Sequence, residues 1–361
     1  MRVTAKERVN CSLAHQQPDR VPIDYQARDE ITAALKQRLG LPSDEALHVA
    51  LGVDLRAVGP TFKGGAAPLA YADPTVQVTE AGIHRDIWGV GFVPNQTAAG
   101  FYMDLAENPL AELDSIGALD EYPWPTADLW DYSRVAEQAR RLSQYHVRVH
   151  SRGIFEISWF LRGFDGFLFD LAARPDLAAR LMDFVQAYLM ERTRRILGAA
   201  GGLVDIVEYN DDVASQKGLF ISPAMWREHL KPRMAEFIRM CKGYGVAIRY
   251  HCCGGLRHII PDLIEIGVDV LNPTQTLAAG MEPEALQCDF GEAITFDGGI
   301  DTQDLMPHAT ADQVRAETRR MIDLMGRNGG YILGPAHAFQ ADVPLDNVIA
   351  VYETALNRTL A

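Results

Sequence analysis

The segment His251-Cys252-Cys253-Gly254 carries imidazole and thiol groups at a spacing suited to one shared metal ion. In an extended backbone, side chains two residues apart point to the same face, so His251 and Cys253 can reach one ion while Cys252 faces away. Zinc binds imidazole nitrogen and thiolate sulfur, and a catalytic zinc site offers three protein ligands and one open position. The pattern alone is weak, because an isolated His-x-Cys pair is more often a packed strand end.

A third metal ligand must come from elsewhere in the chain. His337 ends the last expected strand, and neighbouring strand ends of a barrel converge on one mouth. His258 is a rival ligand, but it lies on the helix expected after Gly254, where exposure to solvent or capping is the commoner role. The predicted metal ligands are therefore His251, Cys253 and His337.

Four carboxylates lie close behind expected strands. Glu156 is in an apolar stretch, where a carboxylate is costly unless it is paired or used, so we predict a catalytic role. Asp211 and Asp212 suit a general base, a carboxylate that supports the metal site, or an anchor for a substrate amine or hydroxyl, but aspartates also cap turns. Asp301 follows Gly298-Gly299-Ile300 and suits ligand orientation or, more commonly, capping of the next helix.

Short apolar strands alternate with helical stretches after residue 123. The expected strands are 147–150, 204–209, 247–251, 268–271, 293–296 and 331–333, and the expected helices are 176–197, 225–244, 259–266 and 311–326. This alternation predicts a parallel sheet, which is either a closed (β/α)₈ barrel or an open, doubly wound sheet.

Polar residues at the ends of many strands favour the barrel. They are Glu156, Asn210, Asp211, Asp212, His251, Cys253, Asn272, Gln275, Asp297, Asp301 and His337. A barrel builds its site from the carboxyl ends of many strands, whereas an open sheet concentrates functional groups at one switch point. No glycine-rich phosphate fingerprint follows the first strand. We therefore predict an α/β fold, a (β/α)₈ TIM barrel with an elaborated N-terminal region.

The chain is expected to form a single domain over residues 1–361. Residues 1–122 are interpreted as N-terminal helices and an irregular cap or entrance, and residues 123–361 as the main series of βα units. In the first part, Arg2 to Leu39 predicts helix, a short strand at Val21-Pro22-Ile23-Asp24, and helix. The stretch from Gly52 to Asn108 is punctuated by glycine and proline.

The composition narrows the classes of partner. With 34 Lys and Arg against 48 Asp and Glu, the net charge of -14 disfavours nucleic acid and anionic membrane surfaces. The N-terminus lacks the apolar region of a signal peptide and no stretch is long enough for a membrane span, so a cytoplasmic location is expected. Five scattered cysteines do not resemble a disulfide framework, which leaves thiols for metal binding or catalysis.

Several motifs together resemble the uroporphyrinogen decarboxylase superfamily over nearly the whole chain. They are Gln17-Pro18-Asp19-Arg20-Val21-Pro22, Ile221-Ser222-Pro223, His251-Cys252-Cys253-Gly254, Phe296-Asp297-Gly298-Gly299-Ile300-Asp301 and the run from Gly329 to His337 with Pro344 and Asn347. That superfamily has a (β/α)₈ barrel and two main branches. One is the cofactor-free decarboxylase of the haem pathway, and the other comprises zinc methyltransferases that work with corrinoid proteins.

The resemblance is closer to the methyltransferase branch. His-x-Cys-Gly marks that branch, together with a late cysteine ligand, and here His337 stands at or beside the position of that cysteine. The decarboxylase branch carries an arginine-rich N-terminal segment, for which Tyr25-Gln26-Ala27-Arg28 offers only Arg28. A set of His, Cys and His lowers the thiolate charge on the metal and favours an oxygen or nitrogen substrate over a thiol.

The resemblance implies a zinc-dependent methyltransferase or demethylase in which Zn²⁺ activates a substrate heteroatom and the methyl group moves to or from a corrinoid protein. Glu156 and Asp211 are then the predicted catalytic residues, and Arg28, Asp212, Gln275 and Asp301 are predicted to bind substrate. A homodimer is also implied by the resemblance. The alternatives are a metal-free decarboxylase and a non-catalytic scaffold that binds metal or corrinoid.

Overall fold

Seven parallel strands form the main sheet of the protein, whose structure is a computed structural model describing residues 3–64, 74–97 and 100–360. Their spatial order is β1-β8-β9-β12-β13-β14-β15. The strands are β1 (Leu55–Ala57), β8 (His146–Arg152), β9 (Ile206–Asn210), β12 (Ala247–His251), β13 (Val270–Thr274), β14 (Thr295–Ile300) and β15 (Tyr331–Pro335). Every residue of β13, β14 and β15 is buried, as expected for strands covered on both faces.

Residues 22–24 join the two edges of this sheet. The backbone N–H of Leu333 donates to the Pro22 carbonyl at 2.8 Å, and the N–H of Asp24 donates to the Leu333 carbonyl at 2.8 Å. On the other side, the N–H of Asp54, just before β1, donates to the Ile23 carbonyl at 2.8 Å. The segment predicted as a strand at Val21 to Asp24 thus completes the ring, and the predicted (β/α)₈ barrel is confirmed.

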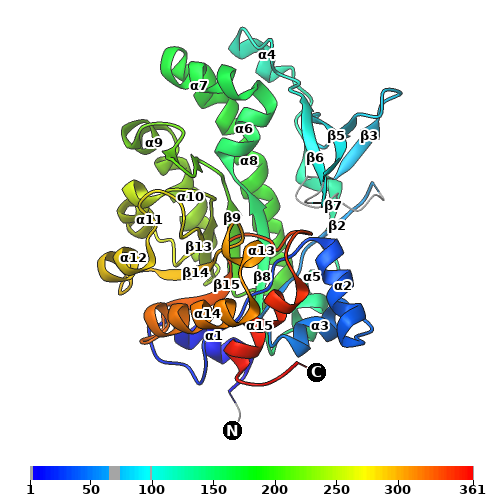
Figure 1. Cartoon of the computed structure of the whole chain (residues 1–361). Helices are drawn as coiled ribbons and strands as arrows, with labels where there is room; N and C mark the ends of the chain where they lie inside the picture. Colours follow the sequence, from blue (N-terminus) through cyan, green and yellow to red (C-terminus); the bar gives the residue numbers. More distant parts are fainter. Residues whose placement is uncertain (1–2, 65–73, 98–99, 361) are drawn as a thin grey trace.

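The helices surround the barrel, except that α4 (Ile116–Asp120) stands away from it at the top of the view in Figure 1. They are α1 (Ala5–Leu13), α2 (Asp29–Leu39), α3 (Asp44–Ala50), α4 (Ile116–Asp120), α5 (Val135–Arg141), α6 (Ile154–Arg162), α7 (Phe164–Ala173), α8 (Pro175–Ala200), α9 (Pro223–His229), α10 (Lys231–Lys242), α11 (Ile260–Glu265), α12 (Pro283–Phe290), α13 (Leu305–His308), α14 (Ala311–Met325) and α15 (Leu345–Leu356), with short 3₁₀ turns at Ala127–Leu129 and Arg257–Ile259. In the described part of the chain, none of these helices combines the length and apolarity that a membrane crossing requires.

Three of the expected helices differ in detail from those of the structure. The single helix expected over 225–244 is split into α9 and α10, because Pro232 is in the first turn of α10 and has no N–H to continue the preceding helix. The helix expected over 259–266 is a 3₁₀ turn followed by the short α11. The expected helix from Arg2 begins at Ala5 as α1, and Arg2 itself lies outside the described residues.

The N-terminal region is more regular than its sequence predicted. A four-stranded antiparallel sheet is formed by β3 (Thr75–Val78), β4 (His84–Asp86), β5 (Gly91–Thr97) and β6 (Gly100–Glu107), and β2 (Thr61–Phe62) pairs with β7 (Trp130–Asp131). A second two-stranded pair, outside the N-terminal region, joins β10 (Ala214–Ser215) to β11 (Gly218–Leu219). Glycine and proline obscure these strands in the sequence from Gly52 to Asn108, and the apolar side chains of β3, Val76 and Val78, are exposed and not packed in a core. Residues 65–73 and 98–99 of this stretch lie outside the described residues. This sheet stands beside α6 and α8 (Figure 1).

Candidate metal centre

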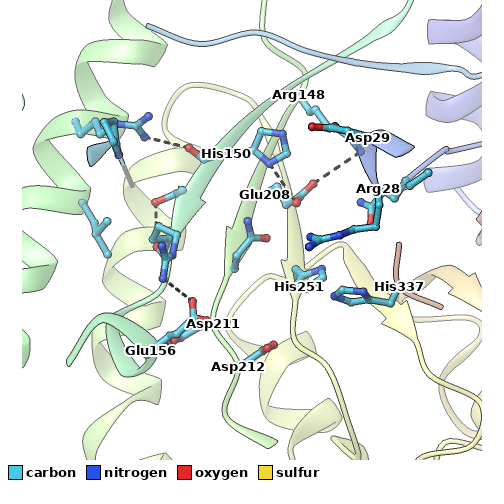
Figure 2. A pocket seen from close by; sticks show the side chains of 18 of the residues that line it. Arg28, Asp29, Arg148, His150, Glu156, Glu208, Asp211, Asp212, His251 and His337 are labelled. Carbon is cyan, nitrogen blue, oxygen red and sulfur yellow. Dashed lines mark hydrogen bonds and ion pairs between the residues drawn. The ribbon is translucent and has the colours of Figure 1, made fainter. Parts of the chain in front are cut away.

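Three side chains converge at the carboxyl ends of the strands. His251 is the last residue of β12, Cys253 lies two residues beyond β12, and His337 lies two residues beyond β15. One donor atom from each of the three lies within 4.8 Å of the others, and Cys253 Sγ is 3.9 Å from His251 Nε2. Donor atoms of a tetrahedral zinc site are roughly 3.3–3.8 Å apart, so small side-chain movements bring this trio to bonding distance. Figure 2 shows the two imidazoles beside each other.

A hydrogen-bond chain fixes which nitrogen of His251 is available. His251 Nδ1 lies 2.7 Å from Asn272 Oδ1, and Asn272 Nδ2 donates to Asp297 Oδ1 at 3.1 Å. Since the Asn272 amide nitrogen is used on the carboxylate, its oxygen must accept from a protonated Nδ1. The lone pair of His251 is then on Nε2, the nitrogen nearest Cys253, as a metal ligand requires.

Burial sets the protonation of the other two groups. It lowers the pKa of His337 to about 4, so this imidazole is neutral at pH 7. Burial, with the neighbouring carboxylates Asp212 and Glu156, raises the pKa of the Cys253 thiol well above its ordinary value. The thiol therefore loses its proton only when a cation compensates the charge, and metal binding at this site should release a proton.

Backbone contacts hold the loop that carries Cys253. The N–H of Cys253 donates to Asp212 Oδ1 at 2.8 Å, and the N–H of Gly254 donates to Gln275 Oε1 at 2.9 Å. Gly254 has a φ of 102°, and a Cβ there would lie 2.3 Å from the Ser215 carbonyl oxygen. Only glycine fits this close approach, so Gly254 belongs to the positioning of the ligand loop.

A cavity of about 790 Å³ opens in front of the two histidines. Strand ends and the N-terminal region both contribute to it. Its lining includes the predicted residues Arg28, Glu156, Asp211, Asp212, His251 and His337, together with Tyr25, Trp88, Tyr102, Trp130, Arg148, His150, Arg152, Tyr188, Arg192 and Glu208. The predicted convergence of strand ends on one mouth is thus found, and Figure 2 shows several of these side chains around the space.

Asp211 supports the start of the helix that carries Glu156. Its two carboxylate oxygens accept from the N–H groups of Glu156 at 2.8 Å and Phe155 at 3.2 Å. A Cβ at Gly153 would lie 2.1 Å from the Asp211 side chain, so a glycine is needed for this approach. Glu156 itself pairs with Arg152 at 3.0 Å. Burial raises the pKa of Asp211 to about 7 and also raises the pKa of Glu156.

Among the described residues that line this cavity, the predicted substrate-binding residues Gln275 and Asp301 are absent. They line a separate, small pocket. The Asp301 carboxylate accepts from the N–H groups of Gln303 at 3.0 Å, Asp304 at 2.9 Å and Leu305 at 2.8 Å, which is the capping arrangement that the sequence offered as the commoner role. Gln275 supports the Cys253 loop from behind, and His258 is exposed and lies outside the trio.

A buried charge cluster beneath the metal centre was missed. Arg249 is fully buried and pairs with Asp24 at 3.0 Å, with Asp297 at 2.8 Å and with Glu208. Arg148 pairs with Asp24 at 2.6 Å. Because Arg249 lies two residues before His251 on β12, the two side chains share the face that points into the barrel, and this alternation could have revealed it. Through Asp297 and Asn272, the cluster reaches His251.

Comparisons with known proteins agree with this architecture. The sequence profile described as uroporphyrinogen decarboxylase (URO-D) matches residues 141–357, which is more than half of the chain. Among solved structures, the chain is similar to a methyltransferase from Methanosarcina mazei, with 18% sequence identity, a TM-score of 0.68 and 99% of each chain covered.

Other likenesses are weak. A zinc-bound IOLI protein has 13% identity and a TM-score of 0.33 over 62% of this chain and 77% of its own, and a mannanase from Podospora anserina has 11% identity and a TM-score of 0.36 over 96% of this chain and 64% of its own. No curated protein sequence matches the chain. The extent of the profile match, on a barrel with this arrangement of strand ends, shows that the chain belongs to the uroporphyrinogen decarboxylase family.

Proposed function

We propose that this protein is a zinc-dependent methyltransferase or demethylase whose metal is held by His251, Cys253 and His337. The observation that carries the proposal is the convergence of one thiol and two imidazoles on a single point at the barrel mouth. The name of the similar Methanosarcina mazei structure, a methyltransferase, supports the type of reaction. A separate corrinoid protein is proposed as the methyl donor or acceptor.

The donor set fits zinc. Sulfur and nitrogen donors suit Zn²⁺ better than Mg²⁺ or Ca²⁺, which prefer oxygen. Three protein ligands leave a fourth position, and His251 and His337 both line the cavity, so that position is within reach of a small molecule. When bound, zinc supplies Lewis acidity, which stabilises the electron pair that a substrate heteroatom holds before it gains, or after it loses, a methyl group.

The remaining roles belong to side chains of the cavity. Glu156 Oε1 and Oε2 are proposed to hold a proton near the substrate heteroatom, with Arg152 fixing the side chain. Asp211 acts by positioning the first turn of α6. Arg28, whose guanidinium lies 4.5 Å from the ring of Tyr102, is proposed to contact substrate at the entrance. Asp212 is proposed to orient substrate in addition to holding the Cys253 backbone.

Metal analysis of the purified protein tests the proposal. We expect about one zinc per chain in the wild type and loss of that zinc in Cys253→Ala. Cys252→Ala and Cys288→Ala are the matched controls. The buried Cys252 Sγ accepts a hydrogen bond from the Val213 N–H, and Cys288 is exposed, so neither thiol belongs to the proposed site. The proposal is contradicted if the purified wild-type protein contains no zinc, or if the zinc content of Cys253→Ala equals that of the wild type.

Activity separates the proposal from its two alternatives. Methyl transfer between a methylated substrate and free cob(I)alamin, lost on chelation and restored by zinc, supports the methyltransferase. Release of carbon dioxide that survives chelation identifies a metal-free decarboxylase instead. Zinc that depends on Cys253 without either reaction, across methylated and carboxylated test compounds, identifies the non-catalytic scaffold.

A further inference from the structure

Arg192 presents a charged group to the cavity without a carboxylate partner in the described part of the chain. It lies on α8, one turn beyond Tyr188, and both side chains line the cavity. Its Nη1 donates to the His150 carbonyl at 3.1 Å, and its guanidinium lies 4.4 Å from the ring centre of Trp130. Stacking on an aromatic face leaves the in-plane N–H groups of an arginine free to meet an anion.

Two neighbouring arginines of the cavity differ in this respect. Arg148 pairs with Asp24 at 2.6 Å, and Arg152 pairs with Glu156 at 3.0 Å, so their charges are already compensated. Arg192 is only partly exposed, and its buried Nε has no hydrogen-bond partner among the residues that the structure describes. A cation held in this way is stabilised when an anionic group of a ligand meets it.

Buried aromatic side chains pack around Arg192 and reach the lining of the cavity. Trp130 Nε1 donates to the Tyr188 hydroxyl at 2.8 Å, and the ring of Tyr188 meets the ring of Trp88 edge to face with centres 4.8 Å apart. We call Trp88, Trp130, Tyr188 and Arg192 the aromatic wall. These rings are largely buried (Trp88 2%, Trp130 7% and Tyr188 7% exposed), so each presents a small, rigid apolar area to the cavity, which suits a compact, rigid ligand better than a flexible chain.

We propose that the substrate is an aromatic carboxylate that carries its methyl group on a ring oxygen or nitrogen, with the carboxylate on Arg192 and the ring along the aromatic wall. The methylated heteroatom is then directed toward His251 and His337 across the same cavity. This inference rests on the proposed function, because the metal supplies the second point of attachment. The size of the cavity, about 790 Å³, leaves room for such a ligand.

Titration calorimetry on the full-length purified protein tests this proposed substrate class, by measuring the binding of three matched probes. 4-Methoxybenzoate has the ring and the carboxylate, methoxybenzene lacks the carboxylate, and 4-methoxycyclohexanecarboxylate lacks the aromatic ring. We expect 4-methoxybenzoate to bind about tenfold or more tightly than either of the other two, since a charge-assisted hydrogen bond and ring contact contribute at least that factor.

Variants assign the effect to Arg192. Arg192→Gln should weaken 4-methoxybenzoate about tenfold or more and leave methoxybenzene unchanged, and Arg192→Lys should retain part of the affinity. Arg194→Gln is the matched control, since Arg194 is on the same helix but is exposed and pairs with Glu191 at 2.6 Å. Thermal unfolding of each variant shows that it is folded.

Three outcomes overturn the inference. They are equal binding of 4-methoxybenzoate and methoxybenzene, equal binding of 4-methoxybenzoate and the cyclohexane analogue, and unchanged affinity for 4-methoxybenzoate in folded Arg192→Gln. The zinc content of the same preparations shows whether such a result rejects the aromatic carboxylate as substrate or rejects the proposed zinc-dependent function. Zinc present without selective binding rejects the aromatic carboxylate alone, whereas Arg192-dependent binding to a chain that takes up no zinc rejects the metal-dependent function.

Discussion

The two ends of the barrel use similar residue types in different ways. At the amino end, Asp54 accepts from Arg8 and Arg20, each at 2.7 Å, and from the N–H of Ile23 at 2.8 Å, so its carboxylate is fully occupied. At the carboxyl end, potential ligand-binding atoms have fewer contacts with the described residues. These are His251 Nε2, Cys253 Sγ and the guanidinium of Arg192. The contrast indicates that charge at the amino end serves stability and charge at the carboxyl end serves binding, as is usual for such barrels.

Removing a charge at the amino end should have the largest effect. Asp54→Ala leaves Arg8 without its buried carboxylate partner, and we expect the free energy of unfolding to fall by about 3–5 kcal/mol. Urea unfolding measures this loss. Zinc bound per folded chain should stay as in the wild type, and loss of zinc from folded Asp54→Ala would contradict the separation of the two ends.

A buried histidine at the amino end makes stability depend on pH. His146 begins β8, and burial lowers its pKa to about 4, with Asp205 opposing and Lys6 and Arg148 adding to the shift. The unfolded chain takes up this proton near pH 6.5 and the folded chain only near pH 4, so stability is present above pH 6.5 and is lost as the pH falls toward 4. The loss attributable to this group reaches about 3 kcal/mol.

The variant His146→Phe isolates that contribution. The wild type should lose stability relative to His146→Phe between pH 6.5 and 4, measured by urea unfolding at each pH. A stability difference between the two proteins that stays constant over this interval would show that His146 does not titrate in this way.

At the carboxyl end, changing a residue behind a ligand should affect metal affinity more than stability. Asn272→Leu removes the acceptor that fixes the His251 tautomer, and zinc affinity should fall about tenfold to a hundredfold. Asn210→Leu is the matched control. Asn210 and Asn272 flank His251 in register on the two neighbouring strands, and in the described structure it is Asn272 that is hydrogen-bonded to the His251 ring. Competition with a chromogenic chelator measures the zinc affinity of both variants. Equal zinc affinities would show that the hydrogen bond from Asn272 does not support the metal site.

The smallest effect is expected at Asp301. If its carboxylate serves only as a cap, Asp301→Ala costs about 1 kcal/mol of stability and leaves zinc affinity and aromatic acid binding unchanged. Thermal unfolding and the calorimetric titrations above provide both readings. Weaker substrate binding in Asp301→Ala would instead support the role in substrate binding predicted from the sequence.

Sequence predicted best where one residue pattern dictates one structure. The strand at Ala247–His251 has the predicted bounds, because it is a short segment between the turn at Gly243-Tyr244-Gly245 and the loop at Cys252-Cys253-Gly254, although the charged Arg249 lies at its centre. His337 could be placed beside His251 since strand ends of a barrel meet. The strands of the four-stranded antiparallel sheet could not be predicted in this way, because most residues of strands such as β3 and β5 are exposed.

Contacts between distant elements account for the rest. Trp130 and Arg192 meet only because the β2–β7 pair and α8 pack on the same side of the cavity, and nothing in either local sequence specifies that contact. The link from Asn272 to Asp297 likewise depends on the register of β13 and β14. Such tertiary pairings are decided by packing rather than by local pattern, so the alternation that points Arg249 into the barrel does not by itself identify its carboxylate partners.

The central claim is that one zinc ion is held by one sulfur and two imidazole nitrogens. X-ray absorption at the zinc edge of the purified wild-type protein tests it most directly, since zinc–sulfur distances near 2.3 Å are resolved from zinc–nitrogen distances near 2.0 Å. We predict one sulfur from Cys253 and two nitrogens from His251 and His337, with a lighter atom at the fourth position. Two sulfurs, or a shell of oxygen alone, would contradict the account.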